Sequence, residues 1–296
     1  MGGGPPQYTD LKALVRNLAH DGPIRAIPTP KRIRLLFNGA FIADTTSALY
    51  IWEHDYYPQF YLPMEAFVKP NGFDVTFHNG EPITESDGSD KIIGRYFKVS
   101  VRREHTDEEY CSVSDMAIFA ADLEGKAECL RNYVKVYFRA IDQWFEDDTP
   151  IYVHPKDPFK RIDTLQSNTP IRITVPSISK DSTSPNEIVL AESPTSVHLY
   201  ETSLPPRYYL PYTSLNTIHL RDSKSTSECP YKGIANYHHV VVGGTAYPDL
   251  VWWYRAPTAE CIAVTGMRCF YNEKVDVWFQ IGGKWTKQER PKTHFA

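Results

Sequence analysis

The sequence predicts a mostly β protein with two tandem antiparallel domains, each carrying one short helix, and an additional helix at the N-terminus. An internal repeat is the first observation behind this fold class, because residues 48–63 return at 196–211 and residues 127–129 return at 259–261. The second observation is that apolar residues recur at every second position in short runs bounded by Gly, Pro and Asn, which is typical of antiparallel strands. A duplicated sequence of this kind sets the domain count and allows the two copies to be compared.

Length and composition agree with two modest domains. The chain has 296 residues, of which 42% are hydrophobic and 23% charged, which is ordinary for globular proteins. We expect an N-terminal extension with a helix over residues 1–29, a first repeat domain over 30–158 and a second repeat domain over 159–296. The oligomeric state is left open by the sequence.

Charge and cysteine content restrict the function classes. The formal net charge is −4 and the basic residues are scattered, so we expect no nucleic-acid partner. Apolar runs stay below the ~18 residues of a membrane span and the N-terminus does not resemble a signal peptide, so no membrane partner is expected. Five cysteines without a Cys-x-x-Cys pair favour a reducing compartment, and we expect a cytoplasmic protein.

The elements of the first copy follow from local patterns. Thr9 is expected to cap a helix in which Leu11, Leu14, Val15 and Leu18 share one face. Asn38-Gly39 is a strong type I′ hairpin signal between two strands. The remaining predicted elements are strands at 49–53, 59–62, 134–138, 141–145 and 151–153, a helix near 124–132, and a loop or added hairpin at 69–91 that holds the sixteen extra residues.

The second copy begins at Ile171, after a proline-stiffened connection over residues 154–170. Its first turn is expected to have grown into a loop at 176–187. Strands are expected at 237–242 and 275–281, each followed by a Gly-Gly turn, and Thr258 is expected to cap a short helix.

Several motifs together resemble the domain-of-unknown-function 427 family. They are Phe37-Asn38-Gly39, the Glu … Pro-x-x-Tyr-x-Pro segments, Cys229-Pro230-Tyr231-Lys232-Gly233, Val242-Gly243-Gly244, Phe270-Tyr271-Asn272 and the bridge over residues 141–158. The resemblance covers roughly residues 30 to 294 and implies a small β-tent type domain used twice. It also carries a nucleotidyltransferase-like label, although the chain lacks a Gly-Ser motif with paired aspartates. β-tent relatives often hold zinc between two Cys-x-x-Cys knuckles, and because neither copy has one or another set of four closely spaced Cys or His ligands, we expect no metal. The chain also has no Gly-x-Gly-x-x-Gly motif after a strand and no P-loop, so we expect no cofactor.

The Cys229–Gly233 turn is the first candidate for chemistry. Pro230 presets a turn and Gly233 can take the left-handed conformation that follows it, which brings the Cys229 thiol and the Lys232 ammonium to one end of the sheet. The cation would favour a thiolate there. The alternative is a plain turn with a solvated lysine.

The second candidate surrounds Glu201, which ends an apolar strand. A carboxylate in such a position needs a partner, and Arg207 or Lys232 could supply it. Glu201 is therefore our candidate acid–base residue, with Arg207 and Lys232 as anion stabilisers. A structural ion pair is the alternative. Substrate-contacting walls are expected from Tyr208, Tyr209, Tyr237 and Cys229, and a contribution near the domain junction from Asp142, Trp144 and His154.

The first copy keeps Glu53 and Tyr61 at the places of Glu201 and Tyr209 but has Gln59 in place of the arginine. We therefore expect one principal site, in the second copy. The function predicted is binding of a small organic metabolite with cofactor-independent acid–base chemistry of isomerase, cyclase or hydrolase type. The alternatives are a non-catalytic module that binds a ligand or a protein, and a nucleotidyltransferase-like activity.

Overall fold

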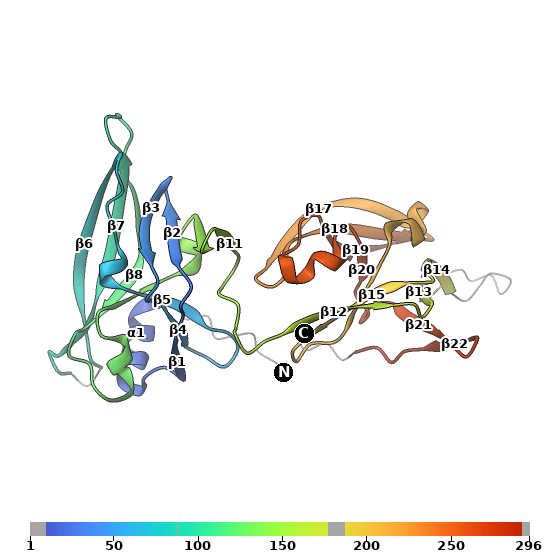
Figure 1. Cartoon of the computed structure of the whole chain (residues 1–296), viewed down its shortest axis with the longest axis horizontal. Helices are drawn as coiled ribbons and strands as arrows, with labels where there is room; N and C mark the ends of the chain where they lie inside the picture. The colour runs from blue at the N-terminus through green and yellow to red at the C-terminus, as the bar shows by residue number, and fades with distance from the viewer. Residues whose placement is uncertain (1–9, 87, 177–186, 292–296) are drawn as a thin grey trace. The chain divides into compact units, whose positions relative to one another are not determined.

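The computed structural model describes residues 10–86, 88–176 and 187–291. The described chain forms two compact units, one ending at Asp157 and the other beginning at Pro158 (Figure 1). Each unit consists of two antiparallel sheets and short helices, which confirms the predicted fold class.

The larger sheet of the first domain has seven strands in the order β1-β4-β5-β9-β8-β7-β6. Their bounds in that order are β1 Arg25–Pro28, β4 Leu49–Trp52, β5 Gln59–Pro63, β9 Tyr133–Val136, β8 Cys111–Phe119, β7 Ile92–Arg103 and β6 Phe73–Thr84. The smaller sheet has the order β11-β10-β2-β3. Its strands are β11 Thr149–Ile151, β10 Gln143–Glu146, β2 Ile33–Phe37 and β3 Ala40–Thr45.

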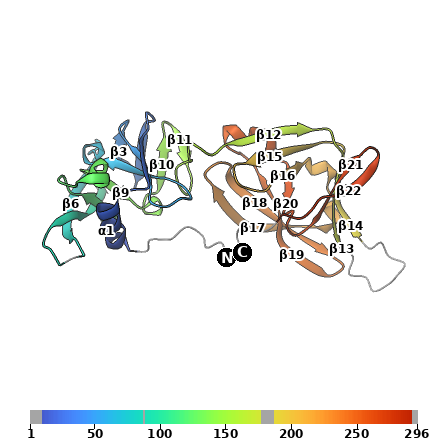
Figure 2. The same cartoon turned by 90° about the horizontal axis from the view of Figure 1, so that it is seen from below.

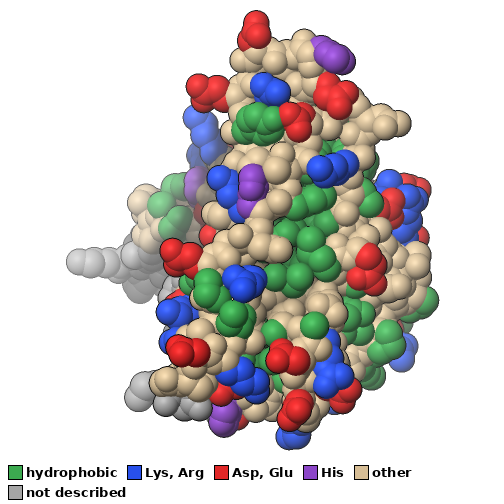
Figure 3. Space-filling model, turned by 90° about the vertical axis from the view of Figure 1, so that its left-hand side faces the viewer, with side chains coloured by type: hydrophobic (Ala, Val, Ile, Leu, Met, Phe, Trp, Pro, Cys, Tyr) green, Lys and Arg blue, Asp and Glu red, His purple; other side chains and the backbone are tan. Residues whose placement is uncertain are grey.

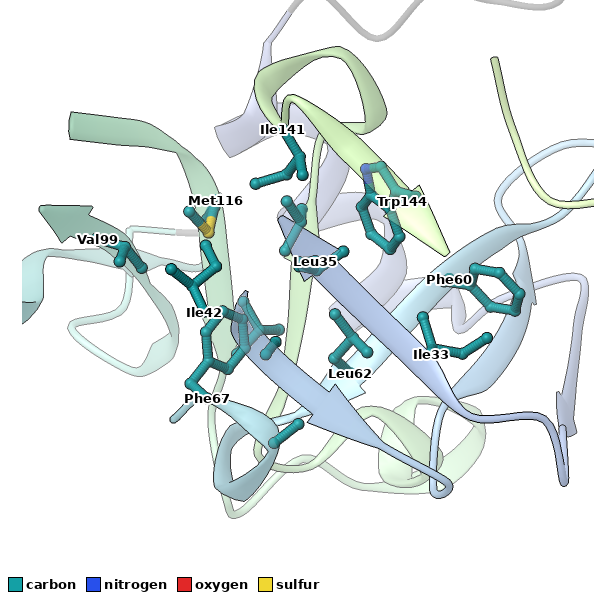
Figure 4. Packing of buried hydrophobic residues seen from close by; sticks show 14 of the residues in the cluster. Ile33, Leu35, Ile42, Phe60, Leu62, Phe67, Val99, Met116, Ile141 and Trp144 are labelled. Carbon is teal, nitrogen blue, oxygen red and sulfur yellow. The ribbon is translucent and has the colours of Figure 1, made fainter. Parts of the chain in front are cut away.

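The core of the first domain lies between these two sheets. Side chains alternate between the two faces of each strand, so every second residue points into this layer. Figure 4 shows residues of the smaller sheet, such as Leu35 and Ile42, packed with Leu62 and Met116 of the larger sheet. The Asn38-Gly39 turn joins β2 to β3 with φ of 47° and 78°, as a type I′ hairpin requires.

The outer face of the larger sheet is covered by α1, Leu11–Asp21. Leu11, Leu14, Val15 and Leu18 are buried, as their spacing predicts, and they pack with residues of the sheet in a second apolar cluster. The helix begins after Asp10, whose carboxylate accepts a hydrogen bond from Lys12 N; the expected cap, Thr9, lies outside the described residues. The helix ends at Gly22, whose φ of 74° is the left-handed conformation that favours glycine.

The second domain repeats this architecture strand for strand. Its larger sheet has the order β12-β15-β16-β20-β19-β18-β17 and its smaller sheet the order β14-β13-β21-β22 (Figure 2). The larger sheet consists of β12 Ile162–Ser167, β15 Ser196–Glu201, β16 Arg207–Leu210, β20 Arg268–Phe270, β19 Thr245–Tyr254, β18 Gly233–Val242 and β17 Leu220–Cys229. The smaller consists of β14 Glu187–Ser193, β13 Ile171–Pro176, β21 Asp276–Ile281 and β22 Lys284–Lys287.

Strand register places the repeated residues at equivalent positions. Leu49 pairs with Tyr61 in the first domain, and Val197 pairs with Tyr209 in the second. Glu53 directly follows β4, and Glu201 is the last residue of β15, its counterpart. The two glutamates therefore occupy the same end of the same strand in the two copies.

The helices between strands are short 3-10 segments, with bounds η1 Met64–Ala66, η2 Gly125–Leu130, η3 Phe138–Ala140, η4 Tyr212–Ser214, η5 Thr217–His219 and η6 Ala259–Val264. η2 and η6 lie where the two short helices were predicted, and Thr258 is the residue preceding η6. In the part of the chain that the structure describes, no helix is long and apolar enough to cross a membrane.

Two local predictions were wrong, and one strand was missed. The segment 69–91 is mainly strand β6, and the extra residues of the first copy do not all lie there. The connection from β6 to β7 spans 85–91, whereas its counterpart in the second copy spans 230–232. The connection from β7 to β8 spans 104–110, whereas its counterpart spans 243–244. The connection 154–170 contains β12, which pairs with β15. The edge strand β1 was not anticipated. The predicted loop at 176–187 lies largely outside the described residues.

Candidate functional site

Glu201 and Lys232 form an ion pair on the outer face of the second domain's larger sheet. Glu201 is placed by the end of β15, and Lys232 by the three-residue turn between β17 and β18. The two side chains retain exposed fractions of 10% and 14%, so the pair is nearly buried but still reaches solvent. Of the two partners considered for Glu201, the structure selects lysine.

Lys232 stays protonated at neutral pH. Burial alone would lower the pKa of this ammonium, but the Cys229 thiol and the Glu201 carboxylate raise it above its usual value. Lys232 can therefore act as a fixed cation and hydrogen-bond donor, whereas a role as a base is disfavoured.

Sulfur and aromatic side chains surround the pair. Cys229 lies close enough to Lys232 to raise the pKa of its ammonium. The pKa of Tyr254 is raised mainly by burial, and Cys229 raises it further. Cys261 is buried and directs its thiol to the carbonyl of Tyr231, in the same turn as Lys232. Burial raises the pKa of the Cys261 thiol to about 11, which makes this residue unreactive at neutral pH.

Arg207 does not join the pair. Both terminal nitrogens of its guanidinium donate to the carboxylate of Glu273 at 2.7 Å, and one of them also donates to Asn272. The guanidinium also lies 5.5 Å from the ring centre of Trp252. A bidentate pair of this kind leaves little of the Arg207 charge for a ligand.

The three predicted tyrosine walls lie in different environments. Tyr209 is fully buried, and its hydroxyl accepts a hydrogen bond of 3.0 Å from Trp252 Nε1. Tyr208 points to the opposite face of the sheet, because side chains alternate along β16, and lines a cavity of about 240 Å³ with Asn272 and Arg290. Tyr237 shares the outer face and bonds to Ser227 Oγ at 2.6 Å. Tyr237 is thus the tyrosine among the three that can line a site at Glu201.

The three candidates of the first domain have local partners. Asp142 accepts a hydrogen bond of 2.7 Å from Asn38 N and so supports the β2–β3 turn. Trp144 is 1% exposed in the core, with its indole donating to Phe138 O at 3.0 Å (Figure 4). His154 stacks on Tyr57 with 3.9 Å between ring centres.

The first domain contains an equivalent pair that the sequence analysis missed. Glu53 Oε1 accepts hydrogen bonds from Lys135 Nζ and from Tyr61 Oη, the latter at 2.9 Å. The exposed fractions of the Lys135 and Glu53 side chains are 2% and 7%. Burial and the Glu53 charge also raise the pKa of the nearby Tyr137 to about 12. This first-domain pair is the more enclosed of the two.

The lysine reaches the repeated glutamate from different places in the two copies. Lys135 lies on β9, opposite Tyr61, whereas the residue opposite Tyr209 on the equivalent strand β20 is Cys269. The second domain replaces that strand lysine with Lys232 from a turn. The glutamate–lysine pair is thus kept although the lysine comes from a different element, and in the second domain Cys229 lies close to the lysine.

The two domains also differ in the helices that pack on the outer face of the larger sheet. α1 packs over the first domain's outer face, in one apolar cluster with Tyr61 and Leu130. Among the described residues of the second domain there is no α-helix, and its outer-face cluster is closed by η6 alone. The Lys232 side chain is also more exposed than that of Lys135, at 14% against 2%.

We also searched the described residues for a metal site, a further cavity and a surface patch of one charge. Within residues 10–86, 88–176 and 187–291, no three His, Cys, Asp or Glu side chains are grouped so as to hold a metal ion. A further cavity of about 440 Å³ lies beside α1 and is lined by Arg16, His20 and Glu85 among others. On the first-domain face seen in Figure 3, basic and acidic side chains are interspersed.

The fold and the site together define a class of protein: a tandem antiparallel β protein with one nearly buried glutamate–lysine pair in each domain. Comparison with known families places the chain more closely. The family described as domain of unknown function 427 matches residues 25–147 and again residues 163–281, so the chain belongs to this family and carries its domain twice. This confirms the resemblance seen in the sequence motifs. No curated protein matches the chain.

Proposed function

We propose that the protein binds a small organic metabolite at the outer face of its second domain and catalyses proton transfer on it. Glu201 is the proton acceptor, Lys232 stabilises the negative charge that develops, and Cys229 and Tyr237 contact the substrate. The first-domain pair, Glu53 and Lys135, has a structural role, in which each enclosed charge compensates the other.

One observation carries the proposal: the pair lies on a sheet face on which α1 also packs in the first domain, whereas the described residues of the second domain have no α-helix on that face. Two enclosed charges attract each other more strongly and are less available to a ligand, whereas water weakens the attraction between exposed charges. The second domain instead keeps both charges in contact with solvent, at 10% and 14% exposure, beside the free thiol of Cys229.

The chemistry that suits this arrangement is removal of a proton from carbon next to a carbonyl group. The Glu201 carboxylate takes the proton, and the electron pair of the C–H bond moves toward the carbonyl oxygen. The resulting enolate oxygen is negative and is stabilised by the Lys232 ammonium. Return of the proton to a different carbon completes an isomerisation. Substrate must insert between the two charges for this step, because they neutralise each other in the free protein.

Solvent deuterium exchange tests this proposal before the substrate is known. The purified protein is incubated with a cell metabolite extract in D₂O, and metabolites that gain one mass unit are identified by mass spectrometry. We expect one compound to exchange with the wild-type protein and with Lys31→Met, which removes a first-domain lysine whose side chain is 42% exposed. Exchange is expected to fall at least about 100-fold in Glu201→Gln, as for loss of a general base.

The outcomes separate catalysis from its alternative. Exchange that persists in Glu201→Gln, or its absence from the folded wild-type protein, contradicts the proton-transfer proposal. A metabolite that binds without exchanging its proton favours the alternative, a non-catalytic binding module. In such a module Glu201 and Lys232 can stay paired, because neither has to transfer a proton. We also propose a cytoplasmic location, which is supported by five free cysteines.

A further inference from the structure

We propose that Tyr212, His238, Trp253 and Arg268 form a second binding site, which takes the carboxylate group of a small organic acid. The site lies on the inner face of the second domain's larger sheet, the face turned toward the smaller sheet. Arg268 alternates with Cys269, which belongs to the outer-face cluster, and shares its face with Phe270 of the inner core. This inference goes beyond the proton-transfer site, which is on the opposite face.

Comparison of the two copies singles out these four residues. Leu210 pairs with Arg268 in the second domain, and Leu62 pairs with Val134 in the first, so Arg268 replaces a valine. The counterparts of Tyr212, His238 and Trp253 follow in the same way from the sequence repeat and from the pairing of the equivalent strands. The first-domain residues at the places of Tyr212, His238, Trp253 and Arg268 are Met64, Phe97, Ile118 and Val134, all within or packed against the inner core.

The replacement opposes stability. Arg268 is only 9% exposed, and within the described residues it forms no ion pair. Burial lowers the pKa of its guanidinium, which reflects the cost of holding this charge away from water. Cation–π contacts offset part of that cost, because the guanidinium lies 4.4 Å from the ring centre of Tyr212 and 4.2 Å from that of Trp253.

The cluster retains hydrogen-bond donors for a ligand. Arg268 Nε donates to His238 Nε2 at 3.3 Å, and Nη1 donates to the carbonyl of Gly266. Nη2 has no hydrogen-bond acceptor among the described residues, and Trp253 Nε1 is buried and likewise lacks one there. The buried Trp253 Nε1 is costly to leave without an acceptor, and a ligand that supplies one would remove that cost.

The charge of the cluster matches one carboxylate. His238 accepts from Arg268, and burial followed by the Arg268 charge lowers its pKa, so its ring is neutral at pH 7. Its Nδ1 lies 3.3 Å from Asp222 Oδ1, whose side chain is 99% exposed. Arg255 lies 5.7 Å from the Trp253 ring centre on the cluster's border. A single guanidinium with an indole N–H suits a monovalent planar oxyanion, and the half-exposed Tyr212 offers a ring to its organic part.

The experiment compares anion binding and stability in the full chain. Benzoate, acetate and inorganic phosphate are titrated into the wild-type protein, Arg268→Met and Arg172→Met, with tryptophan fluorescence and thermal unfolding as readouts. Arg172 is the matched control, because it also lies over a tryptophan, Trp285 at 4.1 Å, but has its own carboxylate partner in Glu192. We expect saturable binding of benzoate to the wild type and to Arg172→Met, and at least about tenfold weaker binding to Arg268→Met.

Stability separates a binding role from a structural one. Since methionine resembles the apolar residues of the first copy, we expect the anion-free Arg268→Met protein to unfold at the same temperature as the wild type or at a higher one. The proposal is overturned if none of the three anions binds, if phosphate binds more tightly than benzoate, or if Arg268→Met keeps its benzoate affinity. A destabilised Arg268→Met protein would assign Arg268 to the fold instead. The solvent deuterium exchange assay for Glu201 is carried out on the same variants, so that a failure of the proton-transfer proposal is distinguished from a failure of this one.

Discussion

Removing the ammonium of Lys135 tests whether the first-domain pair is structural, so that the enclosed Glu53 carboxylate depends on its cation. In Lys135→Met, the Glu53 carboxylate stays at 7% exposure without its cation. Breaking a buried pair in this way costs roughly 3–5 kcal/mol. The Tyr61 hydroxyl still donates to Glu53, so we expect the lower end, about 3 kcal/mol. With a urea m-value of about 2 kcal/mol/M, the unfolding midpoint of the first domain should fall by about 1.5 M.

Pulsed hydrogen exchange at increasing urea, read by mass spectrometry on peptides from residues 49–63, follows the first domain within the full chain. Lys91→Met is the matched control in the same domain, because its partner is Glu85 and its side chain is 48% exposed; it should change stability by less than about 0.5 kcal/mol. The double variant Glu53→Gln/Lys135→Met should regain most of the loss. A Lys135→Met effect no larger than that of the control, or no recovery in the double variant, would refute the reasoning.

Three further outcomes are expected. A Cβ at Gly94 would lie 2.8 Å from Ile118 O and 3.1 Å from Val15 of α1, so Gly94→Ala should loosen the helix and speed amide exchange over residues 11–21; unchanged exchange would contradict this packing. A thiol reagent at neutral pH should modify the exposed Cys111 in the folded protein well before the buried Cys269, whose pKa burial raises; equal rates would contradict the buried position. Tyr137 has its pKa raised to about 12, so between pH 10 and about 12 the unfolded state loses this proton while the folded state keeps it, and stability falls. Alkaline unfolding should therefore be less steep in Tyr137→Phe, and an unchanged pH profile would count against this cause.

The sequence predicted correctly those elements whose conformation depends on neighbouring residues alone. The Asn38-Gly39 turn, the apolar stripe of α1 and the Gly243-Gly244 turn each depend on a few neighbouring residues. The edge strands β1 and β12 were missed because an edge strand is defined by its partner. The Leu165 side chain of β12, for example, is 57% exposed, so β12 shows no strict apolar alternation.

The site was only partly predictable for a similar reason. Glu201 and Lys232 could be associated, because a carboxylate at the end of an apolar strand needs a cation. Lys135 could not, since it alternates with Val134 and Val136 and such a lysine ordinarily faces water. It lies instead on the face of the sheet on which α1, more than 100 residues earlier in the chain, packs. Arg268 was missed because its strand β20 has only three residues, too few for a periodic pattern.

Retention of metabolites tests the central claim, ligand binding at the second-domain pair, most directly. The wild-type protein, Lys232→Met and the control Lys31→Met are each mixed with a cell metabolite extract and separated from free compounds by size exclusion, and the bound molecules are quantified by mass spectrometry. We predict one carbonyl compound retained by the wild type and by Lys31→Met, and reduced at least about tenfold in Lys232→Met. Equal retention by folded Lys232→Met, or no compound retained by the wild type, would contradict the account.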